Sequence, residues 1–195
     1  MATSRADVKN NLRRRLRAQR EERYVEHTLL HLLEIPEISQ STVVASYHSY
    51  GFEPHTHELN RALIAQGKKL LLPRINGENI DWVEWDGLDK SLIAQGKFHE
   101  PVGDVYRNHS AIDVVLVPAL AIDPEGYRLG QGVSMIALLP ILLHGNMVWS
   151  ITMSGWSMTS REIRGIFQSI AGNYLLKSST SIKRCWPINL HTQLL

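Results

Sequence analysis

The chain has 195 residues, of which 44% are hydrophobic and 21% are charged, and its formal net charge is +2. This length suits one domain with its own core, and the composition excludes a disordered or fibrous chain. The single cysteine, Cys185, excludes an internal disulfide, and together with an N-terminus that lacks an apolar signal segment it predicts a cytoplasmic protein.

The first segment is helical and basic. Apolar residues recur at helical spacing among arginines over residues 6–33, which predicts one long helix. Lys9 and Arg13 are four residues apart and therefore lie on one face of it. Three interpretations of this charge stay open, in decreasing order of support from composition: a solvated surface, a nucleic-acid-binding patch and a site for nucleotide phosphates.

The following segments alternate between strands and helices. In chain order we predict a buried strand at 42–49, a helix at 56–66, a strand at 68–75, an edge strand at 82–85 and a buried strand at 113–120. Thr56 is the expected N-cap of the helix, and Gly67 is where the helix ends. This order predicts the α/β class, with a single domain built on a mostly parallel sheet that is flanked by helices.

One hexapeptide, LIAQGK, occurs twice, at 63–68 and at 92–97. No other segment recurs. We therefore interpret the two copies as helix ends or turns that finish in Gly-Lys, and not as a repeat architecture.

Ligands of α/β proteins bind beyond the carboxyl ends of the parallel strands, which points to the segments after the first and the last predicted strand. The first segment holds His48 and Glu53. A carboxylate there can accept hydrogen bonds from an amino-substituted heterocycle, although a solvated or capping glutamate is the simpler interpretation. The second segment, AIDPEGYRLGQG at 121–132, combines glycines with Arg128 as an anion-binding loop does, and a purely structural loop fits the same residues.

Two histidine pairs, His55 with His57 and His27 with His31, have spacings that a metal ion can use. Neither pair is accompanied by a third ligand or by a zinc motif that contains Glu. We therefore predict no metal site built from histidine.

Taken together, residues 6–132 resemble the 5-formyltetrahydrofolate cyclo-ligase family. The resemblance is carried by several motifs in the family's order: KxxLR from Lys9 to Arg13, SYHSYGFEPHTHELNRALIAQGKKLLLPRI, FHEP at 98–101 and DVVLVPALAIDPEGYRLGQG at 113–132. Each motif is modest alone, and their joint order makes coincidence a poor explanation.

The resemblance implies an activity. In that family ATP phosphorylates the formyl oxygen of 5-formyltetrahydrofolate, N10 attacks the activated carbon, and loss of phosphate leaves 5,10-methenyltetrahydrofolate. The implied protein is an ATP-dependent ligase of one-carbon folate metabolism that uses Mg²⁺ with ATP, and it is a monomer that binds this small substrate but neither nucleic acid nor membranes.

The resemblance also implies roles for residues. It assigns Lys9 and Arg13 to the ATP phosphates and His48 and Glu53 to the folate. The nucleotide loop, in which Arg128 supplies the catalytic charge, comprises Arg128, Leu129, Gly130, Gln131 and Gly132.

Residues 133–195 do not continue the pattern. Of the acidic residues, all but Glu162 lie before residue 133. Where the family continues towards Tyr-Asp-Arg, this chain reads Val-Ser-Met-Ile-Ala. If the last base of each codon is read with the first two of the next, the text can become Gly-Phe-Tyr-Asp-Arg. Our hypothesis is a net deletion before codon 133, with off-frame translation afterwards.

This hypothesis divides the chain into a cyclo-ligase-like part, residues 1–132, and an atypical tail, residues 133–195. It predicts an incomplete C-terminal part that lacks the last strands of the sheet, with weak catalysis. A sequencing error, a pseudogene and a tolerated variant stay open as causes. Two other interpretations also stay open: a nucleic-acid-binding protein that uses the Arg-rich helix, and a membrane-anchored product in which residues 135–153 insert.

Overall fold

The structure is a computed structural model that describes residues 5–22, 24, 26, 28–77, 79–122, 128–130, 147–152 and 186–189. For some of these, including Lys9, Arg128 and the last two segments, it describes the backbone alone. The described helices are α1 (Arg5–Glu22), η1 (Leu30–Glu34), α2 (Pro36–Ser39), α3 (His57–Ala65), η2 (Asp89–Ser91) and η3 (His109–Ala111).

The described strands form one large sheet and two small ones. They are β1 (Val43–Ala45), β2 (Lys69–Asn76), β3 (Asn79–Glu84), β4 (Leu92–Gln95), β5 (Phe98–Pro101), β6 (Val114–Pro118), β7 (Ala121–Ile122), β8 (Arg128–Leu129), β9 (Met147–Thr152) and β10 (Trp186–Asn189). The large sheet has the order β10-β9-β6-β1-β2-β3, and the hairpins β4-β5 and β7-β8 stand apart from it.

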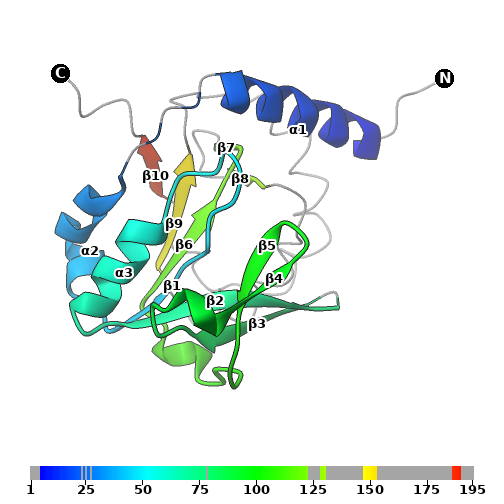
Figure 1. The fold of residues 1–195 in the computed structure, drawn as a ribbon. Coiled ribbons are helices and arrows are strands. Elements are labelled where there is room, and N and C mark those ends of the chain that lie inside the picture. The colour runs from blue at the N-terminus through cyan, green and yellow to red at the C-terminus, as the bar shows by residue number, and fades with distance from the viewer. Residues whose placement is uncertain are drawn as a thin grey trace, which may run out of the picture.

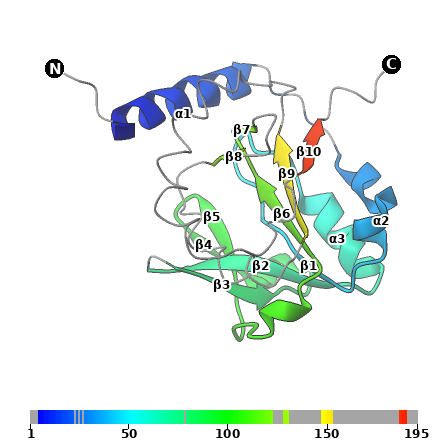
Figure 2. The same cartoon turned by 180° about the vertical axis from the view of Figure 1, so that it is seen from behind.

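The large sheet confirms the predicted α/β class. Its strands pair in parallel except β3, which is antiparallel to β2 and forms the edge, as predicted for residues 82–85. Helix α3 packs on one face of the sheet with α2 beside it (Figure 1), and Leu92 of β4 packs against the same core cluster as Leu59 and Leu63 of α3. Helix α1 lies across the end towards which β6 and β9 point, as the reverse view also shows (Figure 2).

Strand β1 explains why the sheet has a core on each face. Its side chains alternate, so Val44 packs in one buried cluster with Leu59 and Leu63 of α3, whereas Val43 and Ala45 belong to a second cluster. The strand begins where the Asp113 carboxylate accepts hydrogen bonds from the backbone N–H groups of Thr42 and Val43, at 2.7 and 2.9 Å. These contacts set the register of β1 against β6.

The predicted long helix at 6–33 is wrong in its length, because α1 ends at Glu22 and the separate helix η1 begins at Leu30. The residues between them include β-branched and aromatic side chains, which favour helix weakly. In addition, Leu29 and Leu32 are fully buried in the core cluster beside α3. The chain has to leave the axis of α1 to bring them there.

Helix α3 agrees with its predicted range, but Thr56 does not cap it. The Thr56 hydroxyl donates instead to the carbonyl of Tyr47 at 2.6 Å, and the helix has no side-chain cap hydrogen bond. Thr56 is fully buried, so its hydroxyl serves the loop after β1 in place of the helix end. Gly67 ends the helix as predicted, with a φ of +79° that favours glycine.

The tail contributes two strands, which corrects the expectation that the chain lacks the last strands of its sheet. Strand β9 pairs in parallel with β6, and β10 pairs in parallel with β9. The segment MVWSIT that forms β9 is rich in apolar, β-branched and aromatic residues. Such residues favour a strand whether or not the segment is translated in the family's reading frame. The rest of residues 133–195 lies outside the described residues, and the division at residue 132 stays a prediction.

None of the described helices is long and apolar enough to cross a membrane. Of the candidate span at 135–153, residues 147–152 form β9 and the remainder lies outside the described residues.

Candidate active site

A cavity of about 160 Å³ opens beyond the carboxyl ends of β1 and β6. Both segments that the sequence singled out reach it, since the loop after β1 contributes Glu53 and the loop after β6 contributes Gly130. The full lining consists of Ser46, Tyr47, His48, Tyr50, Glu53, Pro73, Ile75, Ile80, Trp82, Phe98, His99, Glu100, Leu116, Val117, Pro118 and Gly130.

A tight turn places Glu53 in the wall. The backbone N–H of Glu53 donates to the carbonyl of Tyr50 at 3.2 Å, and Gly51 inside the turn has a φ of +56°. One carboxylate oxygen of Glu53, Oε2, accepts a hydrogen bond from the backbone N–H of Tyr50 at 3.3 Å. The side chain is 4% exposed. The sequence YGFE thus folds a carboxylate into a largely apolar cavity.

Two tyrosines enclose this carboxylate. Burial raises the pKa of Tyr47 well above its ordinary value, and the nearby charge of Glu53 raises it further. The pKa of Tyr50 is raised by the same two causes. The Tyr47 hydroxyl is already used, because it donates to the carbonyl of Pro54 at 2.9 Å. Both tyrosines therefore stay neutral at physiological pH, and they add no negative charge beside Glu53.

His48 lies at the other side of the loop, within a group of histidine rings. It stacks on His57, with ring centroids 4.1 Å apart, and His99 lies at 5.4 Å. Burial, together with His57 and His99, lowers the pKa of His48 to about 4. Its Nδ1 atom is buried and has no hydrogen-bond partner among the described residues. His48 therefore presents an uncharged ring to the cavity.

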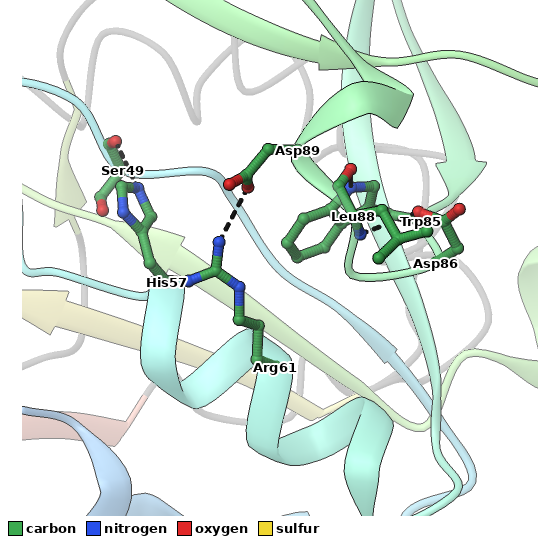
Figure 3. Close-up of polar contacts among 7 residues, drawn as sticks. All are labelled: Ser49, His57, Arg61, Trp85, Asp86, Leu88 and Asp89. Carbon is green, nitrogen blue, oxygen red and sulfur yellow. Dashed lines mark hydrogen bonds and ion pairs between the residues drawn. The ribbon is translucent and has the colours of Figure 1, made fainter.

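The histidines do not form a metal site within the described part of the chain, where no group of three or more His, Cys, Asp or Glu side chains is arranged to hold an ion. His57 instead contacts the carbonyl of Ser49 through Nε2 at 3.0 Å, and its ring is turned towards that residue (Figure 3). Burial lowers the pKa of His57 as well.

The wall behind His48 is fixed by α3 and the segment after β3. Arg61 of α3 forms an ion pair with Asp89 at 2.8 Å, and the indole N–H of Trp85 donates to the carbonyl of Leu88 at 3.1 Å (Figure 3). The Trp85 ring meets His48 edge-on, with centroids 6.1 Å apart. The Arg61–Asp89 pair joins α3 to the segment after β3, and the Trp85 ring of that segment contacts the imidazole.

Helix α1 is fastened to the loop after β6. The Arg13 guanidinium donates through Nε to the carbonyl of Gly130 at 3.2 Å. Leu16 packs against Leu120, Ala121 and Leu129 in a small separate core. The structure therefore brings Arg13 of the basic helix to Gly130, two residues that the resemblance assigns to nucleotide binding.

Some predicted site residues are placed only in part. Lys9 lies on α1 and Arg128 lies in β8, but their side chains are outside the described part of the structure. Leu129 is buried, and Gln131 and Gly132 lie outside the described residues. The roles assigned to these residues stay predictions.

Several lining residues were missed as site residues, above all Trp82 and Tyr50. The indole nitrogen of Trp82 is buried without a hydrogen-bond partner among the described residues. Tyr50 meets Phe98 edge-on at 4.8 Å. The motif FHEP at 98–101 was a usable signal for Phe98, His99 and Glu100, whereas Trp82 reaches the cavity through the pairing of β3 with β2, which no local motif encodes.

Comparison with known proteins gives a consistent result. Residues 2–134 match the model of the family described as "5-formyltetrahydrofolate cyclo-ligase family". The 5-formyltetrahydrofolate cyclo-ligase of Escherichia coli strain K12 is 26% identical over 125 residues, covering 62% of this chain and 69% of that protein. The protein of the same name from E. coli O157:H7 matches equally.

Two solved structures are similar. The 5,10-methenyltetrahydrofolate synthetase of Aquifex aeolicus has a TM-score of 0.56 at 27% identity, covering 74% of this chain and 76% of that one. The corresponding protein of Mycoplasma pneumoniae has a TM-score of 0.51 at 16% identity, covering 77% and 92%, and supports the fold alone.

Proposed function

The chain belongs to the 5-formyltetrahydrofolate cyclo-ligase family, and from this premise we propose that it converts 5-formyltetrahydrofolate to 5,10-methenyltetrahydrofolate with release of ADP and phosphate. Members of the family are ATP-dependent enzymes of one-carbon folate metabolism. The observation that carries the proposal is that one cavity has in its wall both Glu53, from the loop after β1, and Gly130, from the loop after β6.

The folate occupies the Glu53 side of the cavity in this proposal. A buried carboxylate accepts hydrogen bonds from the ring N–H and amino groups of a pterin, and both pair best with a charged acceptor. His48 lines the same part of the cavity with a neutral ring. Apolar and aromatic side chains, Trp82 and Phe98 among them, supply the flat walls that a fused ring needs.

The nucleotide phosphates occupy the Gly130 side. Lys9 and Arg13 share a face of α1, and Arg13 contacts the carbonyl of Gly130. A glycine-bracketed turn lets backbone N–H groups approach phosphate oxygens, and we assign this role to the residues from Arg128 to Gly132. The Arg128 guanidinium would balance the charge that develops on the transferred phosphoryl group.

The chemistry is a phosphoryl transfer followed by ring closure. The γ-phosphoryl group of ATP moves to the formyl oxygen and ADP leaves. The N10 lone pair then attacks the formyl carbon, the N10 proton is released, and the bond from that carbon to the phosphorylated oxygen breaks. The protein contributes mainly by holding the two substrates in contact and by balancing phosphate charge.

Magnesium is proposed as the companion of ATP, because it offsets phosphate charge. It typically takes one or two protein carboxylates in addition to phosphate oxygens and water. Glu100 is the lining carboxylate that the folate does not use in this proposal, so the described wall offers one protein oxygen ligand for such a complex.

The test is conversion of 5-formyltetrahydrofolate by purified protein, followed through the absorbance of the methenyl product. We expect product only when ATP is present, with one ADP formed for each methenyl group. Removal of Mg²⁺ by a chelator should abolish turnover, and excess Mg²⁺ should restore it. Glu53→Gln should raise the KM for 5-formyltetrahydrofolate by roughly tenfold or more, because it removes a charged acceptor. Product formation without ATP would contradict the proposal.

Nucleic-acid binding by the basic helix is not favoured, since Arg13 is directed to Gly130 at the cavity. The cytoplasmic location and the monomeric state remain proposals, and sedimentation of the purified protein tests the second.

A further inference from the structure

Tyr24 follows the end of α1 and contacts the loop that carries Glu53. Its backbone N–H donates to the carbonyl of Glu21, in the last turn of α1, at 3.4 Å. Its ring meets the ring of Phe52 edge-on, with centroids 5.4 Å apart and an interplanar angle of 67°. Edge-to-face pairs at this separation are attractive, because the positive rim of one ring faces the negative face of the other.

The same segment also contacts the loop on the other side of Glu53 in the sequence. The Tyr24 ring is tilted against the imidazole of His55, with centroids 5.8 Å apart. The Glu26 carboxylate lies 3.4 Å from Nδ1 of His55, but this carboxylate is 75% exposed, and exposed pairs contribute little. The ring of Tyr24, which touches both Phe52 and His55, is therefore the main contact between the two segments.

Phe52 depends on this contact more than its neighbours in the loop do. On the buried side of the loop, the Tyr47 hydroxyl donates to the carbonyl of Pro54 at 2.9 Å. Phe52 is 42% exposed and does not line the cavity. Within the described part of the chain, the aromatic ring that packs against Phe52 is that of Tyr24. A side chain this exposed keeps its rotamer freedom unless a neighbour restricts it, so Tyr24 fixes the exposed side of the loop.

Helix α1 gives Tyr24 a fixed base. Leu16 packs against Leu129 in the small core beside the loop after β6. The Arg20 guanidinium donates to the carbonyl of Ala119 through Nη2. The helix is thus anchored next to one of the two loops that supply the cavity wall, and through Tyr24 it contacts the other.

We propose that Tyr24 is a positioning residue for the folate side of the cavity: it packs on Phe52 and His55 and thereby holds the Glu53 carboxylate in place at the wall. This inference deepens the proposed function, on which its kinetic consequences rest. Glu53 directly follows Phe52 in the chain, so a displaced Phe52 moves the Glu53 backbone with it. Hydrogen bonds weaken steeply when their geometry departs from the optimum, and a misplaced carboxylate binds a pterin less well. Tyr24 acts through the loop and does not line the cavity.

The direct test follows the loop and needs no folate. Hydrogen exchange is measured for the backbone N–H of Glu53, which donates to the carbonyl of Tyr50, and for that of Tyr50, which donates to the Glu53 carboxylate. We expect Tyr24→Ala to quicken both about threefold or more, because an aromatic pair that favours the closed loop is lost. Tyr24→Phe, which keeps the ring, should retain the wild-type rates. The N–H of Ser46, which donates to the carbonyl of Leu71 at the start of the same loop, is the internal control and should not change.

The kinetic test uses the same variants. Tyr24→Ala should raise the KM for 5-formyltetrahydrofolate by about three- to tenfold. The KM for ATP should change by less than about twofold, because Arg13 keeps its contact with Gly130. Tyr24→Phe should retain both constants. Glu26→Gln, which alters only the exposed pair with His55, should change the folate KM by less than about twofold. Circular dichroism of each variant verifies that it is folded.

The outcomes separate the two proposals. Unchanged exchange of the Glu53 and Tyr50 amides in Tyr24→Ala overturns the role of Tyr24, whatever the enzyme does. An equal rise in both KM values also overturns it, since that would reflect general damage to α1. A Tyr24→Phe variant that behaves like Tyr24→Ala overturns it too, because the ring would then not hold the loop. If the wild type converts no 5-formyltetrahydrofolate, the proposed function fails, and the exchange rates still decide whether Tyr24 holds Glu53 in place.

Discussion

Arg13 is the residue whose placement bears most directly on nucleotide binding. Its Nε contacts Gly130 at 3.2 Å, and Nη1 contacts Asn10 at 3.1 Å, which leaves guanidinium capacity for a phosphate. We expect Arg13→Gln to raise the KM for ATP roughly ten- to a hundredfold, because a charge-assisted contact is lost. The KM for the folate should change little. Arg14→Gln, one position along the helix, is the control and should leave both KM values unchanged. If the two variants raise the KM for ATP equally, Arg13 acts through the overall positive charge of the helix and not through a direct contact.

His48 makes stability depend on pH. Its pKa is about 4 in the folded protein and 6.5 ordinarily, so between these values the unfolded chain binds more protons. Stability is therefore lost as the pH falls from about 6.5 towards 4. Allowing for partial exposure, we expect a loss of about 1 kcal/mol between pH 7 and pH 5. Urea denaturation at both values measures it.

His48→Gln is the informative variant for this effect, because it keeps a polar side chain and removes the titration. The stability difference between pH 7 and pH 5 should shrink in this variant. His31→Gln, which alters a histidine of η1 away from the stacked rings, should leave the difference as it is. A stability difference that is undiminished in His48→Gln would assign the pH dependence to other groups.

At the residue scale, the sequence indicated candidate site residues that lie in the same loop. His48 and Glu53 were recognisable because they follow a strand, and the structure brings both to one cavity with Gly130. Trp82 was not recognisable. Its place in the wall depends on the antiparallel register of β2 and β3, where it pairs with Pro73. Such placements arise from contacts between distant segments, which local patterns do not contain.

Helix α1 is held by a core of its own. Leu16 is 7% exposed and packs with Leu120, Ala121 and Leu129, apart from the two cores of the sheet. Leu16→Ala should cost about 2–3 kcal/mol, and the loss should appear in this element alone. Hydrogen exchange of the α1 amides should quicken about thirtyfold or more, while β1, β2 and β6 keep their protection. Val8→Ala, at a position that is 45% exposed, serves as the control.

Elements show where local preference decides and where it does not. The two copies of LIAQGK were interpreted as helix ends or turns, and the first does end α3. The second copy begins with β4 and turns at Gly96, which has a φ of +61°. Gly67 and Gly96 both adopt a positive φ, whereas the preceding LIA is helical in the first copy and extended in the second. Leu63 of the helical copy is buried, whereas Ile93 of the extended copy is exposed. Packing around each copy, and not its sequence, therefore selects helix or strand.

At the scale of the whole molecule, the family match runs to residue 134 and ends close to codon 133. The reading-frame hypothesis places a net deletion before that codon. We expect the gene, sequenced across codons 130–136, to continue the cyclo-ligase text in the alternate frame. Restoring that frame should raise turnover and the midpoint of thermal unfolding above those of the present chain. An alternate frame without related text, verified in independent clones, rejects the hypothesis.

The strands of the tail, residues 133–195, could not be predicted from the sequence motifs. Its departure from the family suggested a sheet without its last strands, yet β9 and β10 extend the sheet beyond β6. An apolar, β-branched segment beside an open parallel edge tends to join it, because the edge offers unpaired backbone groups. The sheet order follows from that general tendency and was not readable from motifs.

The shortness of β1 has a consequence for biosynthesis. This strand of three residues stands between β2 and β6, and its first N–H groups wait for the Asp113 carboxylate, 70 positions further along from Val43. When α3, β2 and β3 have left the ribosome, the edge of β1 that later pairs with β6 therefore still has unpaired backbone groups. Until β6 emerges, this unpaired edge can pair with other chains. We therefore expect the nascent chain to be most prone to aggregation, and to benefit most from a chaperone, during this interval.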